Sequence, residues 1–376
     1  MSTRKPRILV ALSGGVDSSV AALLLLQRGY AVEALFMKNW DDDDRDGICA
    51  AAADLASARD VAEELEIPLH KASFAQHYRE RVFARFLEEH RAGRTPNPDI
   101  LCNSEIKFGV FLEHAGRLGF SQVATGHYAR VRRGPQASSL LRGLDPGKDQ
   151  SYFLHAVSSA ALARSELPVG GMVKREVRRL AAEAGLATAT RPDSTGICFI
   201  GERHFRAFLE RYLPREAGPM VTPDGEVVGQ HQGLPFYTLG QRHGLGIGGR
   251  AGDCGAAWYV AGKRREGNEL VVVQGDGHPL LLSDMLRAHS PVWVQQPPRI
   301  AERLQAKTRY RQPDQDCRVL AVTPGLLELA FARPQRAVTP GQSVVLYRGE
   351  ECLGGAVIDR AWRHQHEHPL ASGGAR

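Results

Sequence analysis

Apolar residues in the first half of the chain fall into short runs that alternate with longer segments of helical periodicity. The short runs predict strands at residues 7–12, 32–40, 68–74 and 121–131. The longer segments predict helices at residues 18–30, 54–67, 77–93 and 105–120, with two more at 173–186 and 202–213. This βαβα order is typical of an α/β domain in which helices cover both faces of a parallel sheet.

The pattern changes after about residue 210. Residues 214–277 are rich in glycine and proline, with short strands expected at 257–262 and 269–275. From about residue 280 nearly every segment is β-like, and turn residues follow at short intervals, which favours a small barrel or a sandwich. The strands expected there are 290–296, 303–311, 317–323, 326–332, 342–349 and 352–360.

These patterns divide the chain into three domains and a tail. We expect a parallel-sheet α/β domain over residues 1–210, a small mixed domain over 211–279 and a C-terminal β-barrel over 280–364, with a disordered tail over 365–376. The length of 376 residues agrees with this division, since domains typically hold about 100–200 residues.

The composition of the chain indicates a cellular compartment more clearly than a function. Hydrophobic residues make up 43% of the chain and charged residues 24%, an ordinary globular balance. No run approaches the ~18 apolar residues of a membrane span, and the basic N-terminus leads straight into the first strand rather than into a signal peptide. We expect a cytoplasmic monomer with no membrane partner. The net charge of +6 permits a polyanionic partner such as nucleic acid without requiring one.

The strongest local signal is the sequence SGGVDSS between the first strand and the first helix. A phosphate site belongs at this edge of a parallel sheet, and Gly14 and Gly15 let backbone N–H groups approach phosphates without a Cβ in the way. The helix that follows directs its unpaired N–H groups and its positive dipole end at the anion. The carboxylate of Asp17 repels phosphate unless a cation lies between them, so we expect it to hold Mg²⁺ or a loop amide.

This loop belongs to a specific class of phosphate sites. The chain has no Gly-Lys-Ser/Thr, hence no P-loop, and no GxGxxG dinucleotide fingerprint. Strand–SGGxDS–helix at the N-terminus resembles the PP-loop of N-type ATP pyrophosphatases, which adenylate an acceptor oxygen and release pyrophosphate. Met37, after the second strand, and Gly126, at the end of strand 121–131, lie where such folds place the nucleotide. The alternatives for these two residues are a core methionine and a turn glycine.

Two of the six cysteines stand in unusual surroundings. No CxxC pair is present, which argues against zinc fingers and thioredoxin-like sites. Cys102 lies in TPNPDILCNSEIKF and Cys198 in RPDSTGICFIGERHF, each in a polar loop just before a helix, where the helix dipole stabilises a thiolate. Asp99 lies three residues before Cys102, and the two share a face if the turn Asn97-Pro98-Asp99 is helical.

These segments together point to one family. Over nearly its whole length the chain resembles the bacterial tRNA-specific 2-thiouridylases, which place sulfur on the wobble uridine of certain tRNAs. The segments that carry the resemblance, in the family's order, are SGGVDSS, FMKNW, GRTPNPDILCN, ATGHYAR, GKDQSYFL, DSTGICFIGER, LGQRHGLGIGG, KTRYRQ and TPGQS. Any one of them alone is modest evidence, but the set is highly specific.

The resemblance implies roles for individual residues. The residues implied for ATP are Ala11, Leu12, Ser13, Gly14, Gly15, Val16, Asp17, Ser18, Met37 and Gly126. The target uracil is expected to contact Asn97, Pro98 and Asp99. Other tRNA contacts are implied for His127, Lys148, Asp149, Gln150, Tyr310, Arg311 and Gln342. The catalytic residues implied are Cys198 as the carrier of persulfide sulfur, Cys102 as its partner, and Asp99.

The resemblance also implies cofactors and partners. The cofactors are ATP and Mg²⁺. The partners are tRNAs that accept lysine, glutamate or glutamine, and a sulfur-relay protein or cysteine desulfurase as sulfur donor. For the strand that carries Tyr310 and Arg311, the alternative is a solvated barrel strand. A basic strand with an interleaved tyrosine also suits phosphate contact and base stacking.

Three schemes for the sulfur step stay open at this point. The Cys198 persulfide attacks the adenylated uridine directly, or Cys102 first releases sulfide from it, and both routes leave a Cys102–Cys198 disulfide. In the third scheme Cys102, Cys198 and Asp99 ligate an iron–sulfur cluster with one open iron. Two other functions compete with thiolation. A synthetase that adenylates a small molecule needs no β-barrel, and a non-catalytic RNA-binding module needs no SGGVDSS.

Overall fold

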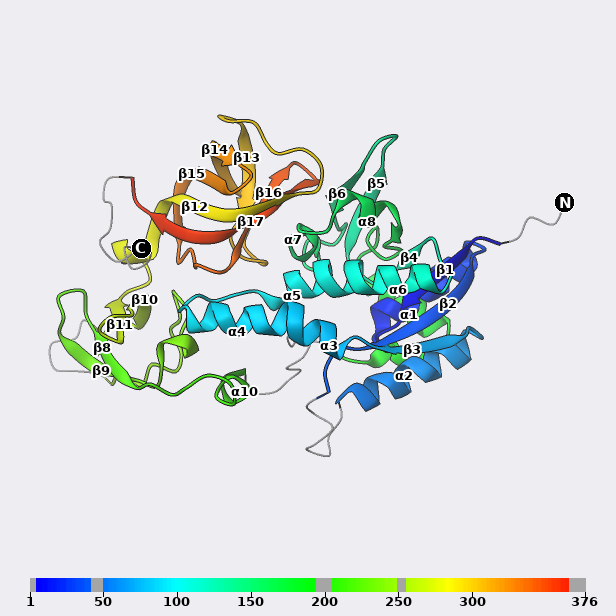
Figure 1. The fold of residues 1–376 in the computed structure, drawn as a ribbon, viewed down its shortest axis with the longest axis horizontal. Helices are drawn as coiled ribbons and strands as arrows, with labels where there is room; N and C mark the ends of the chain where they lie inside the picture. Colours follow the sequence, from blue (N-terminus) through cyan, green and yellow to red (C-terminus); the bar gives the residue numbers. More distant parts are fainter. Residues whose placement is uncertain (1–4, 42–49, 194–204, 249–254, 365–376) are drawn as a thin grey trace.

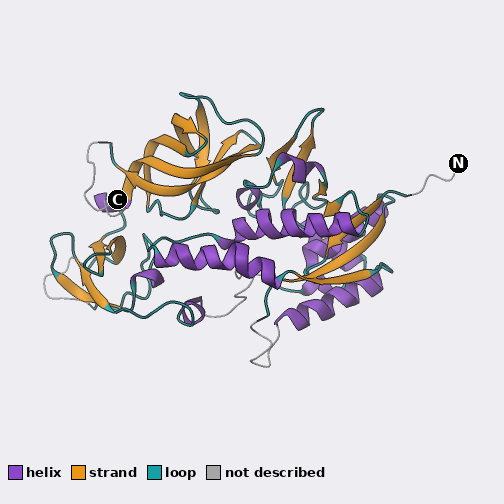
Figure 2. Cartoon of the chain, viewed as in Figure 1, coloured by secondary structure: helices purple, strands orange, loops and turns teal. Residues whose placement is uncertain are grey.

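The computed structural model describes residues 5–41, 50–193, 205–248 and 255–364 and contains three units (Figure 1). The N-terminal unit is a sheet with helices on both faces, the middle unit is a small sheet, and the C-terminal unit is a barrel (Figure 2). Cys198 and the tail 365–376 lie outside the described residues, so the expectations for them stay predictions. Within the described ranges, no helix is long and apolar enough to cross a membrane.

The N-terminal sheet is parallel, as the alternation of strands and helices predicts. Its strand order is β3-β2-β1-β4-β7, and every neighbouring pair is parallel. The strands are β1 (Arg7–Ala11), β2 (Ala31–Lys38), β3 (Leu69–Ser73), β4 (Val123–Ala124) and β7 (Ser165–Glu166). The chain places β2 and β3 on one side of β1 and β4 and β7 on the other, so the strand order reverses at β1. Ligands of such sheets bind outside the carboxyl ends of the strands at this point.

Alternate side chains of β1 are buried on opposite faces of the sheet. Ile8 and Val10 belong to a core shared with α1 (Val16–Gln27) and α2 (Ala50–Glu64). Leu9 belongs to a larger core on the opposite face, built with two long helical segments. The first consists of α3 (Ala75–Tyr78), a π-helical turn (Arg79–Phe83) and α4 (Ala84–Arg91). The second consists of α5 (Pro98–Leu101), a π-helical segment (Cys102–Val110) and α6 (Phe111–Arg117).

Two expected elements of this unit differ from the structure. The helix expected at 105–120 begins at Pro98, because the Asn97 side chain caps it, accepting a hydrogen bond from the Asp99 amide at 3.2 Å, and proline suits the first helical position. The strand expected at 121–131 is two strands in different sheets. β4 ends at Ala124, and after a turn the chain enters β5 (Ala129–Arg133). The turn contains Gly126, which packs against the backbone of α1.

The middle and C-terminal units are built mainly of strands. The middle sheet has the order β10-β11-β8-β9, with β8 (Gly218–Val221), β9 (Val227–His231), β10 (Trp258–Arg264) and β11 (Glu269–Gln274). The barrel contains β12 (Leu282–Trp293), β13 (Arg303–Lys307), β14 (Gln315–Thr323), β15 (Leu326–Arg336), β16 (Ser343–Arg348) and β17 (Glu351–Trp362). Pairing of β12 with β17 closes it, so the unit is a barrel and not a sandwich.

The barrel strand expected at 303–311 ends early. β13 stops at Lys307, and the next residues form a turn in which the Gln312 side-chain oxygen accepts hydrogen bonds from the Thr308 amide at 2.7 Å and the Thr308 hydroxyl at 2.9 Å. Tyr310 and Arg311 therefore lie on a turn and not on a strand.

A hairpin of the N-terminal unit extends the barrel sheet. Its second strand, β6 (Ser138–Arg142), which the sequence pattern did not indicate, pairs with β5 and also with β17, where Leu140 lies opposite Cys352. The Arg142 guanidinium lies 3.7 Å from the centre of the Tyr347 ring and donates to Asp314 at 2.9 Å. A continuous sheet therefore holds the barrel to the N-terminal unit, in addition to a shared apolar core.

His155 lies in the contact between these two units. It follows α7 (Ser151–Leu154), its Nδ1 lies 2.8 Å from the Tyr152 carbonyl oxygen, and its ring lies against Gly355 of β17, where a Cβ would come within 2.7 Å of it. The side chain is 3% exposed, and burial lowers the pKa of His155 to about 4.

We predict that His155 makes the protein less stable as the pH falls from 6.5 towards 4. In this window the unfolded chain binds a proton at His155 and the folded chain does not, so stability present above pH 6.5 is lost, by up to about 3 kcal/mol. Denaturant unfolding of the wild type and of His155→Gln across this range measures the effect. The variant should lose less stability than the wild type, and equal losses would contradict the assignment.

Candidate functional site

The segment between β1 and α1 forms a tight loop at the carboxyl edge of the sheet. Gly14 has a φ of +77°, and a Cβ there would lie 2.4 Å from the Asp54 carbonyl oxygen in α2. The Gly14 carbonyl accepts hydrogen bonds from Ser57 Oγ at 2.9 Å and from Arg191 Nη1 at 2.7 Å, and Arg191 also pairs with the Asp54 carboxylate. Residues far along the chain therefore hold the path of the loop.

α1 begins directly after Gly15 and has no side-chain cap. The hydroxyls of Ser18 and Ser19 instead donate to the Gly15 carbonyl, each at 2.9 Å, and Ser18 Oγ accepts from the Ser13 amide at 3.2 Å. The amide groups of the first helical turn therefore stay available for an anion at the positive end of the helix dipole. This is the arrangement that the SGGVDSS sequence predicts.

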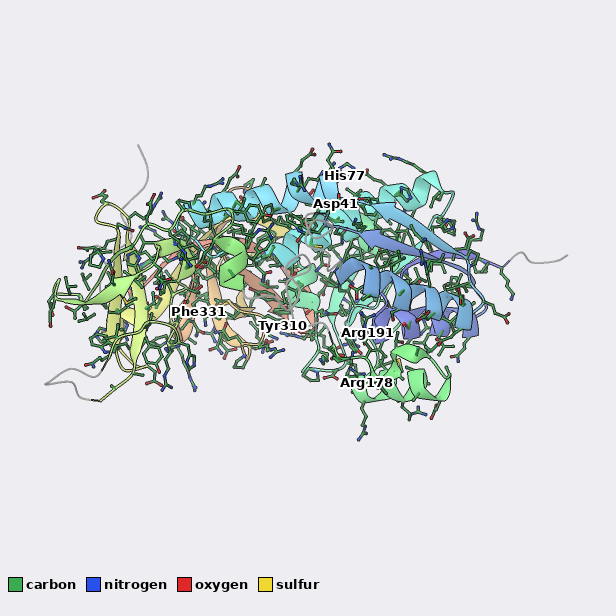
Figure 3. All side chains as sticks on the ribbon, turned by 90° about the horizontal axis from the view of Figure 1, so that it is seen from below. Asp41, His77, Arg178, Arg191, Tyr310 and Phe331 are labelled. Carbon is green, nitrogen blue, oxygen red and sulfur yellow. The ribbon has the colours of Figure 1, made fainter. Side chains whose placement is uncertain are left out.

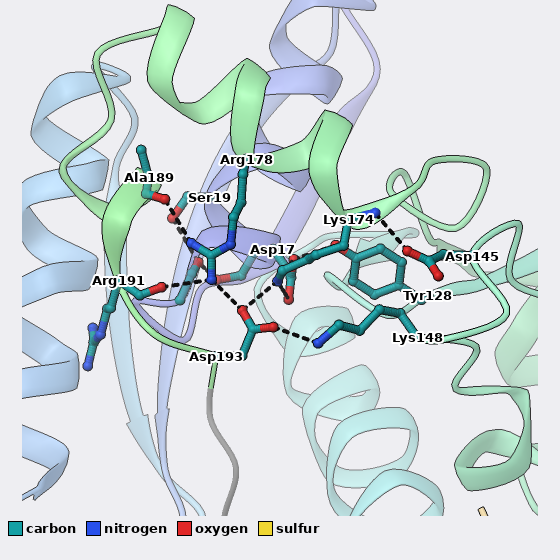
Figure 4. A network of polar contacts seen from close by, with 12 residues as sticks. Asp17, Ser19, Tyr128, Asp145, Lys148, Lys174, Arg178, Ala189, Arg191 and Asp193 are labelled. Atoms are coloured by element: carbon teal, nitrogen blue, oxygen red, sulfur yellow. Dashed lines mark hydrogen bonds and ion pairs between the residues drawn. The ribbon is translucent and has the colours of Figure 1, made fainter. Parts of the chain in front are cut away.

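The carboxylate of Asp17 is neutralised by an ammonium group. Lys174, the first residue of α9 (Lys174–Glu183), donates to both oxygens of Asp17 at 2.6 and 2.8 Å (Figure 4). The Tyr128 hydroxyl donates to one of them at 2.6 Å. Burial, followed by the charge of Asp17, raises the pKa of Tyr128, so its phenol keeps the proton that it donates. The partners of Asp17 are thus a lysine and a tyrosine, where the sequence predicted Mg²⁺ or a loop amide.

Asp193 gathers three cations beside this loop. Its carboxylate lies 2.6 Å from Lys148 Nζ, 2.8 Å from Lys174 Nζ and 2.7 Å from Arg178 Nη2 (Figure 4). Burial alone would raise the pKa of Asp193, but hydrogen bonds and charge from Lys148 and Lys174 outweigh it and lower the pKa to about 2. Asp193 therefore stays ionised, and Lys174 bridges two carboxylates.

Sequence reasoning missed these partners of the loop. It gave no role to these residues, although two of them lie in segments that carry the resemblance, Tyr128 in ATGHYAR and Asp193 in DSTGICFIGER. One signal was available, because an aspartate inside a phosphate loop requires a cation. The sequence does not indicate which cation this is, because Lys174 lies 157 residues further along the chain than Asp17.

The resemblance implies that Gly126 contacts ATP, and in the structure the group that lies closest to it is protein backbone. A Cβ on Gly126 would lie 2.7 Å from both the Asp17 carbonyl carbon and the Ser18 nitrogen. The absent side chain therefore lets the end of β4 pack against the start of α1. Direct contact of Gly126 with a nucleotide stays a prediction.

Four other residues implied for ATP belong to the protein core. Ala11, Leu12 and Val16 are buried, so they can offer a nucleotide little more than backbone atoms. Met37 is half-buried in β2 and packs at the edge of the large core. The core interpretation of Met37 therefore holds, and its contact with adenine stays a prediction.

Cys102 lies one turn inside a helix and not before its start. Because the helical segment begins at Pro98, Asp99 and Cys102 share a face, as their spacing predicts. The Cys102 side chain is fully buried in the large core, and Asp99 is half-buried. The neighbouring Asn103 donates from its side chain to the Phe153 carbonyl at 3.2 Å, which ties this helix to α7.

The turn after β13 faces the N-terminal unit. The ring centres of Tyr310 and Phe153 are 4.3 Å apart, and Figure 3 shows Tyr310 between the barrel and the N-terminal unit. Arg311, the next residue, is exposed. An aromatic ring beside an exposed guanidinium suits a base and a phosphate, whereas the alternative of a solvated strand does not fit a turn.

Two residues implied for tRNA contact are buried. His127 is 8% exposed, its Nδ1 lies 2.7 Å from Thr125 Oγ1, and burial lowers its pKa well below the usual value, so its ring is neutral. Asp149 is 6% exposed and accepts hydrogen bonds from the amides of Gly143 and Ser151 at 2.9 and 3.0 Å. Both side chains organise the loops around the site, and their contact with tRNA stays a prediction.

The remaining implied tRNA residues lie closer to solvent but are also bonded to the protein. Gln150 accepts the Tyr128 amide at 2.9 Å, next to the loop of residues 13–19, which we call the phosphate loop. Gln342 of the barrel donates to the Thr95 carbonyl at 2.6 Å, two residues before Asn97. Lys148 contacts Asp193 as described above. The structure thus brings Lys148 and Gln150 together with the phosphate loop, and Gln342 together with the turn at Asn97.

Three family models match the chain in the order of its units. They are the tRNA methyl transferase HUP domain over residues 6–202, the tRNA methyl transferase PRC-barrel domain over 206–274 and the aminomethyltransferase beta-barrel domain over 283–358. Among solved structures, a 4-thiouridine synthetase–RNA complex with bound ATP aligns with 55% of this chain. The alignment covers 49% of the synthetase chain, with 17% sequence identity and a TM-score of 0.32.

Curated relatives match along almost the whole chain. The tRNA-specific 2-thiouridylase MnmA of Chromohalobacter salexigens is 57% identical over 364 residues, which cover 96% of this chain and 95% of the relative. That of Alkalilimnicola ehrlichii is 58% identical over 354 residues, which cover 94% and 97% of the two chains. That of Marinobacter nauticus is 56% identical, with 96% and 93% covered. With this identity over almost its whole length, the chain belongs to the tRNA-specific 2-thiouridylase family.

Proposed function

We propose that this chain uses ATP to adenylate O2 of the wobble uridine in tRNA and then replaces that oxygen with sulfur. The observation that carries the proposal is the glycine loop with the uncapped start of α1, placed where the strand order reverses. Such a loop binds the phosphates of a nucleotide. The full-length relatives, named tRNA-specific 2-thiouridylases, support tRNA as the acceptor.

The first step makes O2 a leaving group. O2 of the uracil attacks the α-phosphorus of ATP, the bond between the α- and β-phosphates breaks, and pyrophosphate leaves. O2 is then bonded to AMP and departs with it when sulfur adds to C2. The amide groups of the loop and of the first turn of α1 stabilise the charge on the phosphates, because they are already oriented before the reaction.

Mg²⁺ would reach this site bound to the phosphates of ATP. In the part of the chain that the structure describes, no group of three or more His, Cys, Asp or Glu residues could hold a metal ion. Both oxygens of Asp17 already accept hydrogen bonds from Lys174. A metal ion at Asp17 has to displace an ammonium group, so the residues present do not fit a resident Mg²⁺.

The sulfur step uses two cysteines. In one route the terminal sulfur of a Cys198 persulfide attacks C2, AMP leaves, and the Cys102 thiolate attacks the Cys198 sulfur, which frees the thiocarbonyl. In the other route Cys102 first attacks the persulfide, and the released sulfide attacks C2. Both routes end in a Cys102–Cys198 disulfide, which a reductant must clear, and both need a sulfur-relay protein or cysteine desulfurase to reload Cys198. Asp99, on the face of Cys102, orients the base or moves a proton.

The uridine has to leave the anticodon stack to reach these groups. The turn with Tyr310 and Arg311 supplies a ring for stacking and a cation for phosphate, and the net charge of +6 favours a polyanion. We assign tRNAs that accept lysine, glutamate and glutamine as substrates, and a cytoplasmic monomer as the working form.

Release of pyrophosphate from ATP, measured with and without tRNA, tests the function. We expect release that depends on tRNA, and 2-thiouridine at the wobble position by nucleoside mass spectrometry when a persulfide donor is present. Release with a small acceptor but with no tRNA would favour the synthetase. No release with any acceptor would favour an RNA-binding module.

We predict that Cys102→Ser and Cys198→Ser each abolish thiolation while ATP binding survives, because each removes a sulfur that the transfer requires. Cys317→Ala is the matched control, since burial raises the pKa of the Cys317 thiol to about 12 and keeps it inert. Thiolation is measured by nucleoside mass spectrometry with a persulfide donor supplied. Full thiolation by either serine variant would contradict the two-cysteine scheme. Iron and sulfide in anaerobically purified protein would favour the cluster scheme instead.

We predict that Gly126→Ala weakens ATP binding by about tenfold or more, since the new methyl group forces the backbone at Asp17 and Ser18 out of its place in the loop. Gly171→Ala is the control, because nothing lies within 4 Å of a Cβ at Gly171. Calorimetric titration with ATP compares the two. Equal affinities would show that the loop tolerates the shift.

A further inference from the structure

Lys148, Lys174 and Arg178 converge on the single carboxylate of Asp193, within reach of the phosphate loop. Lys174 also contacts the carboxylate of Asp17, and a third carboxylate, that of Asp145, accepts the backbone amide of Lys174 and not its ammonium group. A carboxylate placed beside a triphosphate repels it, whereas lysines attract it. A phosphate bound at the loop could therefore replace the Asp193 carboxylate as the partner of these lysines.

Lys174 is held in place for such an anion. Its backbone amide donates to the Asp145 carboxylate at 2.9 Å, its ammonium group is 5.6 Å from the centre of the Tyr128 ring, and its side chain is only 12% exposed. Because the ammonium group already contacts Asp17 inside the loop, it needs little movement to reach a phosphate bound there.

Arg178 has a different part in the cluster. Its guanidinium donates to the carbonyls of Ala189 and Arg191 at 2.8 and 3.0 Å as well as to Asp193. These bonds hold the chain segment that carries Asp193. Arg178 is therefore a positioning residue, while the ammonium group of Lys148 has only Asp193 as its partner among the described residues.

We propose that Lys174 and Lys148 bind the β- and γ-phosphates of ATP, and then the pyrophosphate product, and that Asp193 is the anion that occupies both lysines when no nucleotide is bound. The inference rests on the proposed ATP chemistry at the same loop. Pyrophosphate carries more charge than a carboxylate and offers more acceptor oxygens, so it outcompetes Asp193 for the two ammonium groups.

The role that the resemblance implies for Lys148 is contact with tRNA. A phosphate of tRNA and a phosphate of ATP offer a lysine the same chemistry. Titration with inorganic pyrophosphate in the absence of tRNA isolates the nucleotide role.

Calorimetric titration of the full chain with pyrophosphate, and separately with AMP, tests the inference. Lys174→Gln and Lys148→Gln should each weaken pyrophosphate binding by about tenfold or more, and should weaken AMP binding less. Asp193→Asn should tighten pyrophosphate binding several-fold, since it removes the competing anion. Arg179→Gln is the control on the same helix, because Arg179 is exposed and pairs with Glu183 away from the cluster, and it should change neither affinity.

Pyrophosphate binding that is unchanged in both lysine variants, or that is no tighter in Asp193→Asn, would overturn the inference. Tighter binding cannot result from misfolding, so the Asp193→Asn measurement decides the question even if a lysine variant fails to fold. A wild type that binds pyrophosphate as expected but releases none from ATP with tRNA would contradict the proposed function and leave the phosphate site standing.

Discussion

The negative charge of Asp17 determines which side chains have to lie beside the phosphate loop. Asp17 lies at the positive end of α1, where we propose that the triphosphate of ATP binds, so it needs a partner of opposite charge. The structure supplies Lys174 from the start of α9 and the phenol of Tyr128 from the turn after β4. Each partner makes a second contact. Lys174 also pairs with the carboxylate of Asp193, and the Tyr128 amide donates to the Gln150 side chain. One carboxylate therefore joins the loop to two distant parts of the N-terminal unit.

Gln150, the partner of Tyr128, lies in a segment that also contacts the barrel. Gln150 follows Asp149, whose carboxylate lies 3.7 Å from Arg142, and Arg142 in turn bonds Asp314 of the barrel and lies over Tyr347. The hairpin that carries Arg142 is also a strand neighbour of β17. The barrel and the phosphate loop thus share one frame of sheet and buried contacts. If the barrel binds tRNA, as we propose, this frame keeps the tRNA in a defined position relative to the loop at the start of α1.

Patterns of neighbouring residues in the sequence predicted the features that depend on interactions between neighbouring residues. Periodicity predicted the parallel sheet and the β-rich end, and the spacing of Asp99 and Cys102 predicted their common helical face. The same kind of pattern could also have predicted the helix start at Pro98, since Asn97 is a typical capping residue and proline is typical of the first turn.

Three contacts could not be predicted from local sequence patterns. The packing of Gly126 on α1, the pairing of β6 with β17 and the pair of Asp17 with Lys174 each join segments that are far apart in the chain. The role of Cys198 stays a prediction, because the residue lies outside the described ranges.

If ATP activates O2 of the wobble uridine, that oxygen leaves the tRNA bonded to the phosphorus of AMP, and an isotope label can follow it. A tRNA labelled with oxygen-18 at O2 of the wobble uridine is thiolated with ATP and a persulfide donor, and the products are analysed by mass spectrometry. We predict that the label leaves the tRNA in AMP and that pyrophosphate is unlabelled. Label found in water, in pyrophosphate or in free phosphate would contradict adenylation at O2.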